Sequence, residues 1–136
     1  MFKRYADIVN ANIQGLDVMV PTDIQNRYKF STTLYNGTVT ASGNGSDVDV
    51  SPFSVLEIEL KVTSVSGTTP TLDIYIEGKF ENTGDYKTLA SQTGITATGT
   101  WFFTINPCAF RYLRVRYVVG GTSPSFTFRV EAQGMV

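Results

Sequence analysis

The side chains that could do chemistry in this chain are mainly carboxylates, because histidine is absent from all 136 residues. Without histidine, neither a Ser-His-Asp or Cys-His nucleophile nor a His-ligated zinc or iron centre can be built. Glu57 with Glu59 and Asp73 with Glu77 form possible carboxylate pairs. If their segments are strands, each pair points outward, which is more often a solvated face than a glycosidase pair.

Other ligand chemistry is also weakly supported. Asp47 and Asp49, near Asn44, could offer oxygens to calcium, but their spacing fits no calcium loop and three ligands are too few. No phosphate-cradling Gly-Lys-Ser/Thr sequence occurs, and Gly120-Gly121 is not followed by a helical segment. We therefore expect no catalytic residue, no cofactor and no metal site.

Arginines gather in the C-terminal third of the chain. Arg114 and Arg116 share the outward face of a predicted strand, and Arg111 and Arg129 lie nearby in sequence or across the proposed hairpin. They could form a patch for a partner, but ion pairing on the protein's own surface is the preferred interpretation. The expected acidic partners are Glu57, Glu59 and Glu131.

Three aromatic residues, Tyr75, Phe102 and Tyr112, are expected on open strand faces. They could form a platform on which sugars stack. Aromatic residues at such positions also pair across strands or fill a subunit interface. We favour an interface that includes these aromatics together with Arg114 and Arg116.

The element that organises these residues is the stretch Val55–Gly78. Its apolar residues alternate with polar ones on both sides of a Gly-Thr-Thr-Pro corner, which indicates strands with one buried face and predicts a hairpin. Val119–Glu131 matches Val65–Glu77 position by position, so a second hairpin and a duplicated scaffold are expected. Gly67 and Gly121 should adopt backbone conformations that are open to glycine.

Turn signals divide the remainder of the chain. Asn36-Gly37 predicts a further hairpin, and Gly43-Asn44-Gly45 predicts a chain reversal. Glu81–Asp85 reads as a loop and Tyr86–Ala90 as a short strand.

Thr98–Asn106 is a clearer strand, in which Trp101 should face the core and Phe102 the open side. About eight strands without a helical segment predict an all-β, antiparallel β-sandwich that is jelly-roll-like and covers residues 28–136.

Composition agrees with one β-rich domain, since 42% of the residues are hydrophobic and 17% are charged. The net charge of −1 makes no overall case for nucleic acid or an anionic membrane. Cys108 is the only cysteine, which excludes an internal disulfide. No signal peptide or membrane span is expected, because no segment approaches the roughly 20 apolar residues that a span needs.

The first 27 residues differ from the rest, because neither helical nor strand periodicity persists there. The segment is nevertheless too apolar for a solvated tail, and we expect an extended N-terminal arm that packs on a partner. Its candidate contact residues are Phe2, Tyr5, Ile8, Leu16, Val18 and Val20.

Two segments, Val62–Ile74 and Phe110–Phe128, resemble small structural proteins of tailed bacteriophages. In that group a strand leads into Val-Ser-Gly-Thr-Ser-Pro-Thr-Leu-Asp, and a later Arg-Tyr-Leu-Arg-Val strand leads into Gly-Gly-Thr-Ser-Pro-Ser-Phe. The resemblance covers roughly Val48–Ala132, and Tyr86 stands where similar sequences often have Trp.

The resemblance implies a virion component, and some family members look like capsid decoration, or cement, proteins that sit as trimers on the shell. It implies no catalytic residues. We therefore expect a non-enzymatic protein that is made in the host cytoplasm, resides on the capsid surface, self-associates and contacts the major capsid protein. The alternative is a tail or surface adhesin that binds a host glycan through Tyr75, Phe102 and Tyr112.

Overall fold

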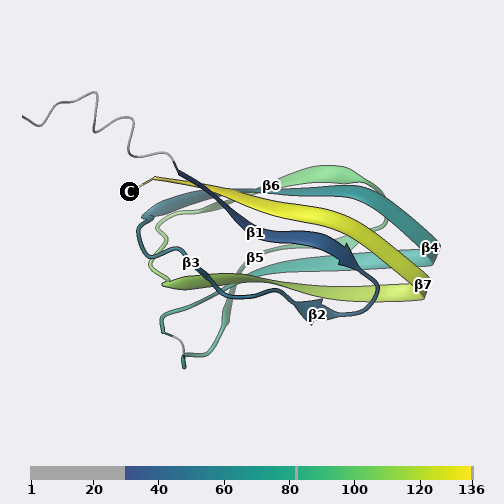
Figure 1. The fold of residues 1–136 in the computed structure, drawn as a ribbon, viewed down its shortest axis with the longest axis horizontal. Coiled ribbons are helices and arrows are strands. Elements are labelled where there is room, and N and C mark those ends of the chain that lie inside the picture. The colour runs from purple at the N-terminus through teal and green to yellow at the C-terminus, as the bar shows by residue number, and fades with distance from the viewer. Residues whose placement is uncertain (1–29, 82, 136) are drawn as a thin grey trace, which may run out of the picture. The chain divides into compact units, whose positions relative to one another are not determined.

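The computed structural model describes residues 30–81 and 83–135, and this part of the chain contains strands and no helix (Figure 1). It therefore holds no helix that could cross a membrane. The strands are β1 (Phe30–Val39), β2 (Gly43–Asn44), β3 (Val48–Asp49), β4 (Val55–Lys79), β5 (Lys87–Ile95), β6 (Gly99–Ile105) and β7 (Tyr112–Met135).

Ser31–Gly134 form one compact unit. Of the other unit, Met1–Phe30 with Met135–Val136, the described residues are Phe30 and Met135. The six candidate contact residues of the arm lie outside the described residues.

The two long strands, β4 and β7, each contribute to both layers of a sandwich. The first half of β4 pairs with β6, from Leu56 opposite Ile105 to Val62 opposite Gly99. Its second half pairs with β5, from Leu72 opposite Ile95 to Gly78 opposite Lys87. Figure 1 shows β4 and β7 bending at the same end of the sandwich.

One sheet therefore contains β1, the second half of β7, the first half of β4, and β6. The other contains β2 and β3, the first half of β7, the second half of β4, and β5. The chain crosses repeatedly between the two layers, within β4, within β7 and between β5 and β6, as it does in a jelly roll. The predicted fold class, an all-β antiparallel sandwich, is confirmed.

The prediction that Val55–Gly78 is a hairpin is wrong. The two halves of β4 do not pair with each other, and β7 likewise runs as one strand through Gly-Gly-Thr-Ser-Pro. The two repeats are instead neighbours, since β4 is hydrogen-bonded to β7. Side-chain contacts join Glu59 to Arg129 and Glu77 to Arg114, so the two strands run in opposite directions. A bent strand gives the same alternation as a hairpin, because period two records only which face is buried.

The two Gly-Thr-Thr/Ser-Pro corners lie against each other. Gly67 has φ of 113° and Gly121 has φ of 106°, which confirms the conformation expected of both. A Cβ on Gly67 would lie 2.7 Å from the Ser123 carbonyl oxygen, and one on Gly121 would lie 2.6 Å from that of Thr69. The close approach of the two backbones therefore requires glycine at both positions.

Two turn predictions in the N-terminal half are wrong. β1 continues through Asn36-Gly37, where it lies along β7. Thr33 and Thr38 both contact outward residues of β7 although they are an odd number of residues apart, so the alternation slips once between them. The Asn-Gly pair lies within this interval, and β1 continues through it without a turn because β7 continues beside it and can pair with its backbone.

Gly43-Asn44-Gly45 does not reverse the chain either. β2 and β3 both run antiparallel to the first half of β7, with Gly43 opposite Tyr117 and Val48 opposite Leu113. Between them, the Gly45 N–H donates to the Val115 carbonyl oxygen at 2.8 Å. The loop prediction for Glu81–Asp85 is confirmed, and β5 extends past the predicted short strand to Ile95.

The core lies between the two sheets and follows the predicted alternation. Trp101 is partly buried against it and Phe102 is exposed, as expected. At roughly 1.5 to 3 kcal/mol for each large apolar side chain, this layer supplies most of the favourable free energy of folding. Its buried apolar members are Leu34, Val39, Val50, Leu56, Ile58, Leu60, Val62, Leu72, Ile74, Ile76, Ile95, Ile105, Cys108, Leu113, Val115, Phe126, Phe128, Val130 and Ala132.

Candidate partner interfaces

The outer face of the sheet that contains β5 carries a cluster of charges centred on Glu77. One carboxylate oxygen accepts a hydrogen bond from Arg114 Nε at 2.9 Å, and the other accepts one from Arg116 Nε at 2.7 Å. Glu77 lies on β4 and both arginines lie on the adjacent β7. The side chain of Glu77 is 8% exposed, against 19% for Arg114 and 35% for Arg116. The expectation that Glu77 is a solvated outward residue is therefore wrong, because the two arginines cover it.

Aromatic rings hold the two guanidinium groups in place. The Arg114 guanidinium carbon lies 3.5 Å from the centre of the Tyr86 ring, and that of Arg116 lies 4.1 Å from the centre of the Tyr75 ring. Such cation–π contacts stabilise a charge that also has a carboxylate partner. Both arginines are thus fixed in orientation, and neither is a freely moving surface charge.

Asp47 and Lys79 extend the cluster. Lys79 Nζ lies 2.9 Å from the Asp47 carboxylate, and the Tyr86 hydroxyl donates a hydrogen bond to the same carboxylate at 2.6 Å. Partial burial acts to raise the pKa of Asp47, but the hydrogen bonds from Tyr86 and Lys79 outweigh it and lower that pKa. The hydrogen bond to Asp47 raises the pKa of Lys79. The pair is therefore fully charged at neutral pH.

The predicted interface residues divide between the two sheets. Tyr75, Tyr112, Arg114 and Arg116 belong to the sheet that contains β5, whereas Phe102 lies on β6 in the other sheet. The proposed sugar platform of Tyr75, Phe102 and Tyr112 is therefore not formed. The outward faces of two stacked sheets point in opposite directions.

The four arginines form ion pairs, as the preferred interpretation expected, but three of their partners, Glu77, Asp49 and Glu81, differ from those expected. Arg114 and Arg116 pair with Glu77, and Arg111 lies 3.9 Å from Asp49 and 3.6 Å from Glu81. Arg129 approaches Glu59 at 3.5 Å, which is the one expected pairing that the described residues contain. Sequence reasoning missed the Asp47–Lys79–Tyr86 contacts because they join three segments that are far apart in the chain.

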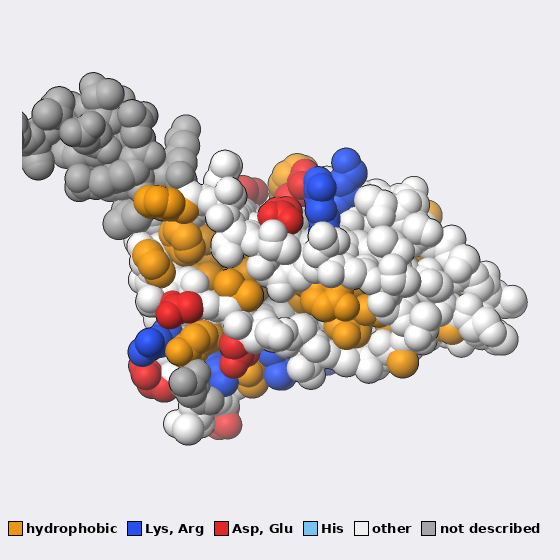
Figure 2. All heavy atoms as spheres, viewed as in Figure 1, with side chains coloured by type: hydrophobic (Ala, Val, Ile, Leu, Met, Phe, Trp, Pro, Cys, Tyr) orange, Lys and Arg blue, Asp and Glu red, His pale blue; other side chains and the backbone are white. Residues whose placement is uncertain are grey.

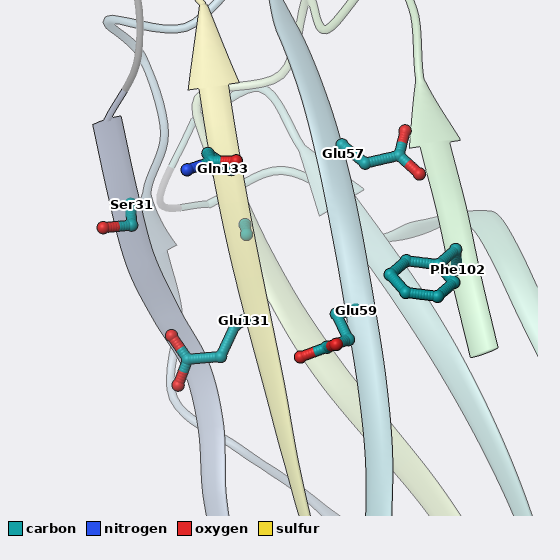
Figure 3. A pocket seen from close by; sticks show the side chains of 7 residues that line it. Ser31, Glu57, Glu59, Phe102, Glu131 and Gln133 are labelled. Atoms are coloured by element: carbon teal, nitrogen blue, oxygen red, sulfur yellow. The ribbon is translucent and has the colours of Figure 1, made fainter. Parts of the chain in front are cut away.

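The outer face of the other sheet has a shallow hollow of about 280 Å³, which crosses β1, β7, β4 and β6 (Figure 3). We call it the acidic groove. Its carboxylates point in different directions: Glu131 accepts hydrogen bonds from the Thr33 hydroxyl on β1, and Glu57 accepts one from the Thr104 hydroxyl on β6. The residues that line the acidic groove are Ser31, Glu57, Glu59, Phe102, Glu131, Ala132 and Gln133.

Neither face has the geometry of a metal site within residues 30–81 and 83–135, where no group of three or more suitable ligands converges. Asp47 binds Lys79, and Asp49 accepts a hydrogen bond from the Ser51 backbone N–H at 2.9 Å. The weak calcium hypothesis for these two aspartates is therefore not supported.

In Figure 2, the end of the sandwich where β4 and β7 bend presents an almost uncharged surface, and the charged side chains gather elsewhere.

No protein-family model matches the chain, and no curated protein matches its sequence. Among solved structures, the chain is similar to the SPBc2 prophage-derived protein YomS, with 16% identity and a TM-score of 0.51. That match covers 78% of this chain and 93% of YomS, and it shows a shared fold.

Two further solved structures match with lower scores. A chain of the Bacillus endospore appendages, which are disulfide-linked pili, has 15% identity and a TM-score of 0.45, covering 79% of this chain and 85% of that one. VP2 of the infectious bursal disease virus subviral particle has 16% identity and a TM-score of 0.42, covering 79% of this chain and 30% of VP2.

Proposed function

We propose that this chain is a non-enzymatic structural protein of a bacteriophage virion. Within that role, it acts as a capsid decoration, or cement, protein that self-associates and bridges subunits of the major capsid protein. It is made in the host cytoplasm and resides on the capsid surface. Its partners are proteins, with no nucleic acid or membrane among them.

The observation that carries this proposal is the fold shared with the prophage-derived YomS, which extends over almost the whole of that protein. The two corners give independent support, because they lie inside the segments that resemble tailed-phage structural proteins. We propose a trimer as the self-associated state, because some of the tailed-phage proteins that the chain resembles sit as trimers on the shell.

The two outer faces also suit a binding protein. Arg114 and Arg116 are held between Glu77 and two tyrosine rings, so they offer a partner a surface that needs little ordering. On the opposite sheet, Phe102 is 62% exposed beside three carboxylates. Both are features from which protein contacts are commonly built.

The test is to look for the protein in purified particles. Mass spectrometry of gradient-purified virions should detect it in a fixed ratio to the major capsid protein, and purified protein should bind to particles from a deletion phage. Particles that lack the protein altogether, or protein that does not bind to deletion particles, would refute the proposal. Location in isolated heads, with none in isolated tails, separates a head protein from a tail protein.

The adhesin alternative now depends on Phe102 and its acidic neighbours, since Tyr75 and Tyr112 lie on the other sheet. An exposed ring beside carboxylates can also stack on a sugar and accept hydrogen bonds from its hydroxyls. Glycan-array binding that is lost in Phe102→Ala, together with no binding to capsids, would favour the adhesin.

A further inference from the structure

The acidic groove keeps like charges together without a cation among the described residues that line it. Glu59 on β4 and Glu131 on the adjacent β7 line the same hollow as Glu57, and its described lining includes no lysine or arginine (Figure 3). Three carboxylates and no cation in this lining give the hollow a negative character, which a cationic partner would offset.

The contacts of the carboxylates leave most of this charge uncompensated. Glu57 and Glu131 accept hydrogen bonds from threonine hydroxyls, which are neutral. Glu59 has Arg129 at 3.5 Å, a long and partly exposed ion pair. The groove is thus net negative, and its carboxylates Glu57 and Glu131 form no ion pair with a described residue.

Phe102 adds an apolar and aromatic side to the same hollow. Its side chain is 62% exposed and lies on β6, next to Glu57 and Glu59 of β4. A ring beside carboxylates suits a cation, which is attracted by both, and it suits an aromatic residue next to that cation. The chemistry of the site is therefore that of a receptor for a short segment containing basic and aromatic residues.

The chain itself contains such a segment outside the described residues. Residues 2–5 read Phe-Lys-Arg-Tyr, with two adjacent cations between two aromatic rings. The stretch from Tyr5 to Phe30 can span at most about 90 Å when fully extended, which is ample to reach a second molecule. We propose that the acidic groove of one copy binds Phe2–Tyr5 of a second copy, with Lys3 and Arg4 against the carboxylates.

This inference rests on the self-association that the proposed function includes, and it names the surface where the arm binds. Because the charges are partly exposed, the contact weakens as salt rises. Removal of two charge pairs is expected to weaken association about tenfold, which corresponds to about 1.4 kcal/mol.

The experiment is a charge swap in the full chain, followed by sedimentation equilibrium at low and high salt. The groove variant carries Glu57→Lys and Glu131→Lys, and the arm variant carries Lys3→Glu and Arg4→Glu. Each alone should associate about tenfold more weakly than the wild type. An equal mixture should recover association, because the basic arm of one variant meets the acidic groove of the other, and the acidic arm meets the basic groove.

Two controls keep the result interpretable. Asp85→Lys changes an exposed acidic residue in the loop before β5 and should leave association unchanged. If the groove variant melts at a lower temperature, Glu57→Gln with Glu131→Gln removes the charges and retains the shape, and should weaken association in the same direction.

The inference is overturned by a wild type that stays monomeric, by a groove variant that associates normally, or by a mixture that does not recover. Glycan binding at Phe102 in place of the arm would also overturn it. Binding of the wild type to capsids is measured separately. If the wild type binds capsids and the groove variant associates normally, the inference alone is refuted. If the mixture recovers association but the wild type does not bind capsids, the proposed function alone is refuted.

Discussion

Replacement of Gly67 or Gly121 by alanine tests whether the two corners interlock. Each glycine has a positive φ, and a Cβ at either position would press on the backbone of the opposite corner. Gly67 would meet Ser123 O at 2.7 Å and Pro124 Cα at 2.8 Å, so no flexible side chain can move aside. Backbone strain and a steric clash therefore act together at each position.

The two contributions can be separated with Gly94, which has φ of 69° and no atom within 4 Å of the place that a Cβ would occupy. Alanine at a left-handed position costs about 1–2 kcal/mol, and a reduced entropy of the unfolded chain returns about 0.4–1 kcal/mol. Gly94→Ala should thus lower the free energy of unfolding by about 0–1.6 kcal/mol. Overpacking adds about 1–3 kcal/mol at the corners, so Gly67→Ala and Gly121→Ala should each cost about 1–4.6 kcal/mol.

Urea denaturation of the three variants at 25 °C measures these differences directly. Because both substitutions force the same two backbone segments apart, the double variant should cost less than the sum of the single ones. If Gly67→Ala and Gly94→Ala lose the same stability, the clash is absorbed without cost and the interlocking of the corners is refuted.

Three further predictions concern the core, the Glu77 cluster and pH. Leu60→Ala opens a cavity between the sheets and should lower the free energy of unfolding, measured with urea, by about 2–5 kcal/mol. Glu59→Ala should lower it by less than about 1 kcal/mol. Equal losses of stability in the two variants would mean that the buried and exposed faces of this strand are exchanged. Glu77→Ala leaves two partly buried arginines without their carboxylate and should lower the free energy of unfolding by about 2–4 kcal/mol. The control is Glu81→Ala, which should lower it by less than about 1 kcal/mol because the Glu81 side chain is 69% exposed. Similar urea midpoints for the two variants would contradict this prediction. Because the fold lowers the pKa of Asp47, protonation of this carboxylate opposes folding. Thermal melts should therefore show Asp47→Asn less stable than wild type at pH 7, with the difference vanishing as the pH falls below about 4, and a difference that persists at pH 2 would refute the assignment.

The sequence could predict which face each strand buries, but not which strands are neighbours. Alternation of Leu56, Ile58 and Leu60 requires one buried face whatever lies beside the strand, and this prediction is confirmed. A corner of Gly, Thr and Pro is compatible with a hairpin and with a bent strand, because these residue types occur both in turns and at bends within strands. The choice between them depends on pairing between β4 and β7, which is a contact between residues far apart in the chain.

The same limit applies to the candidate interfaces. The outward direction of Arg114, Arg116 and Glu77 could be predicted from their positions in alternating segments. Their mutual contact and the burial of Glu77 could not, since they follow from β7 lying next to the second half of β4. The hairpin predicted at Asn36-Gly37 was wrong for a related reason. A strong local turn signal is overridden where a long neighbouring strand continues to supply hydrogen-bond partners.

The repeat places corresponding carboxylates on the two outer faces, where their neighbours give the faces different chemistry. Position-by-position matching of the repeats aligns Glu77 with Glu131, one in each sheet. The strand beside Glu77 supplies two arginines, so that carboxylate is neutralised within the chain. The strand beside Glu131 supplies Glu59, and the hollow that they share remains acidic. Glu77 is thus neutralised within the chain, whereas Glu131 accepts hydrogen bonds from the neutral Thr33 hydroxyl and forms no ion pair with a described residue. The acidic groove is therefore the face where binding should be tested first.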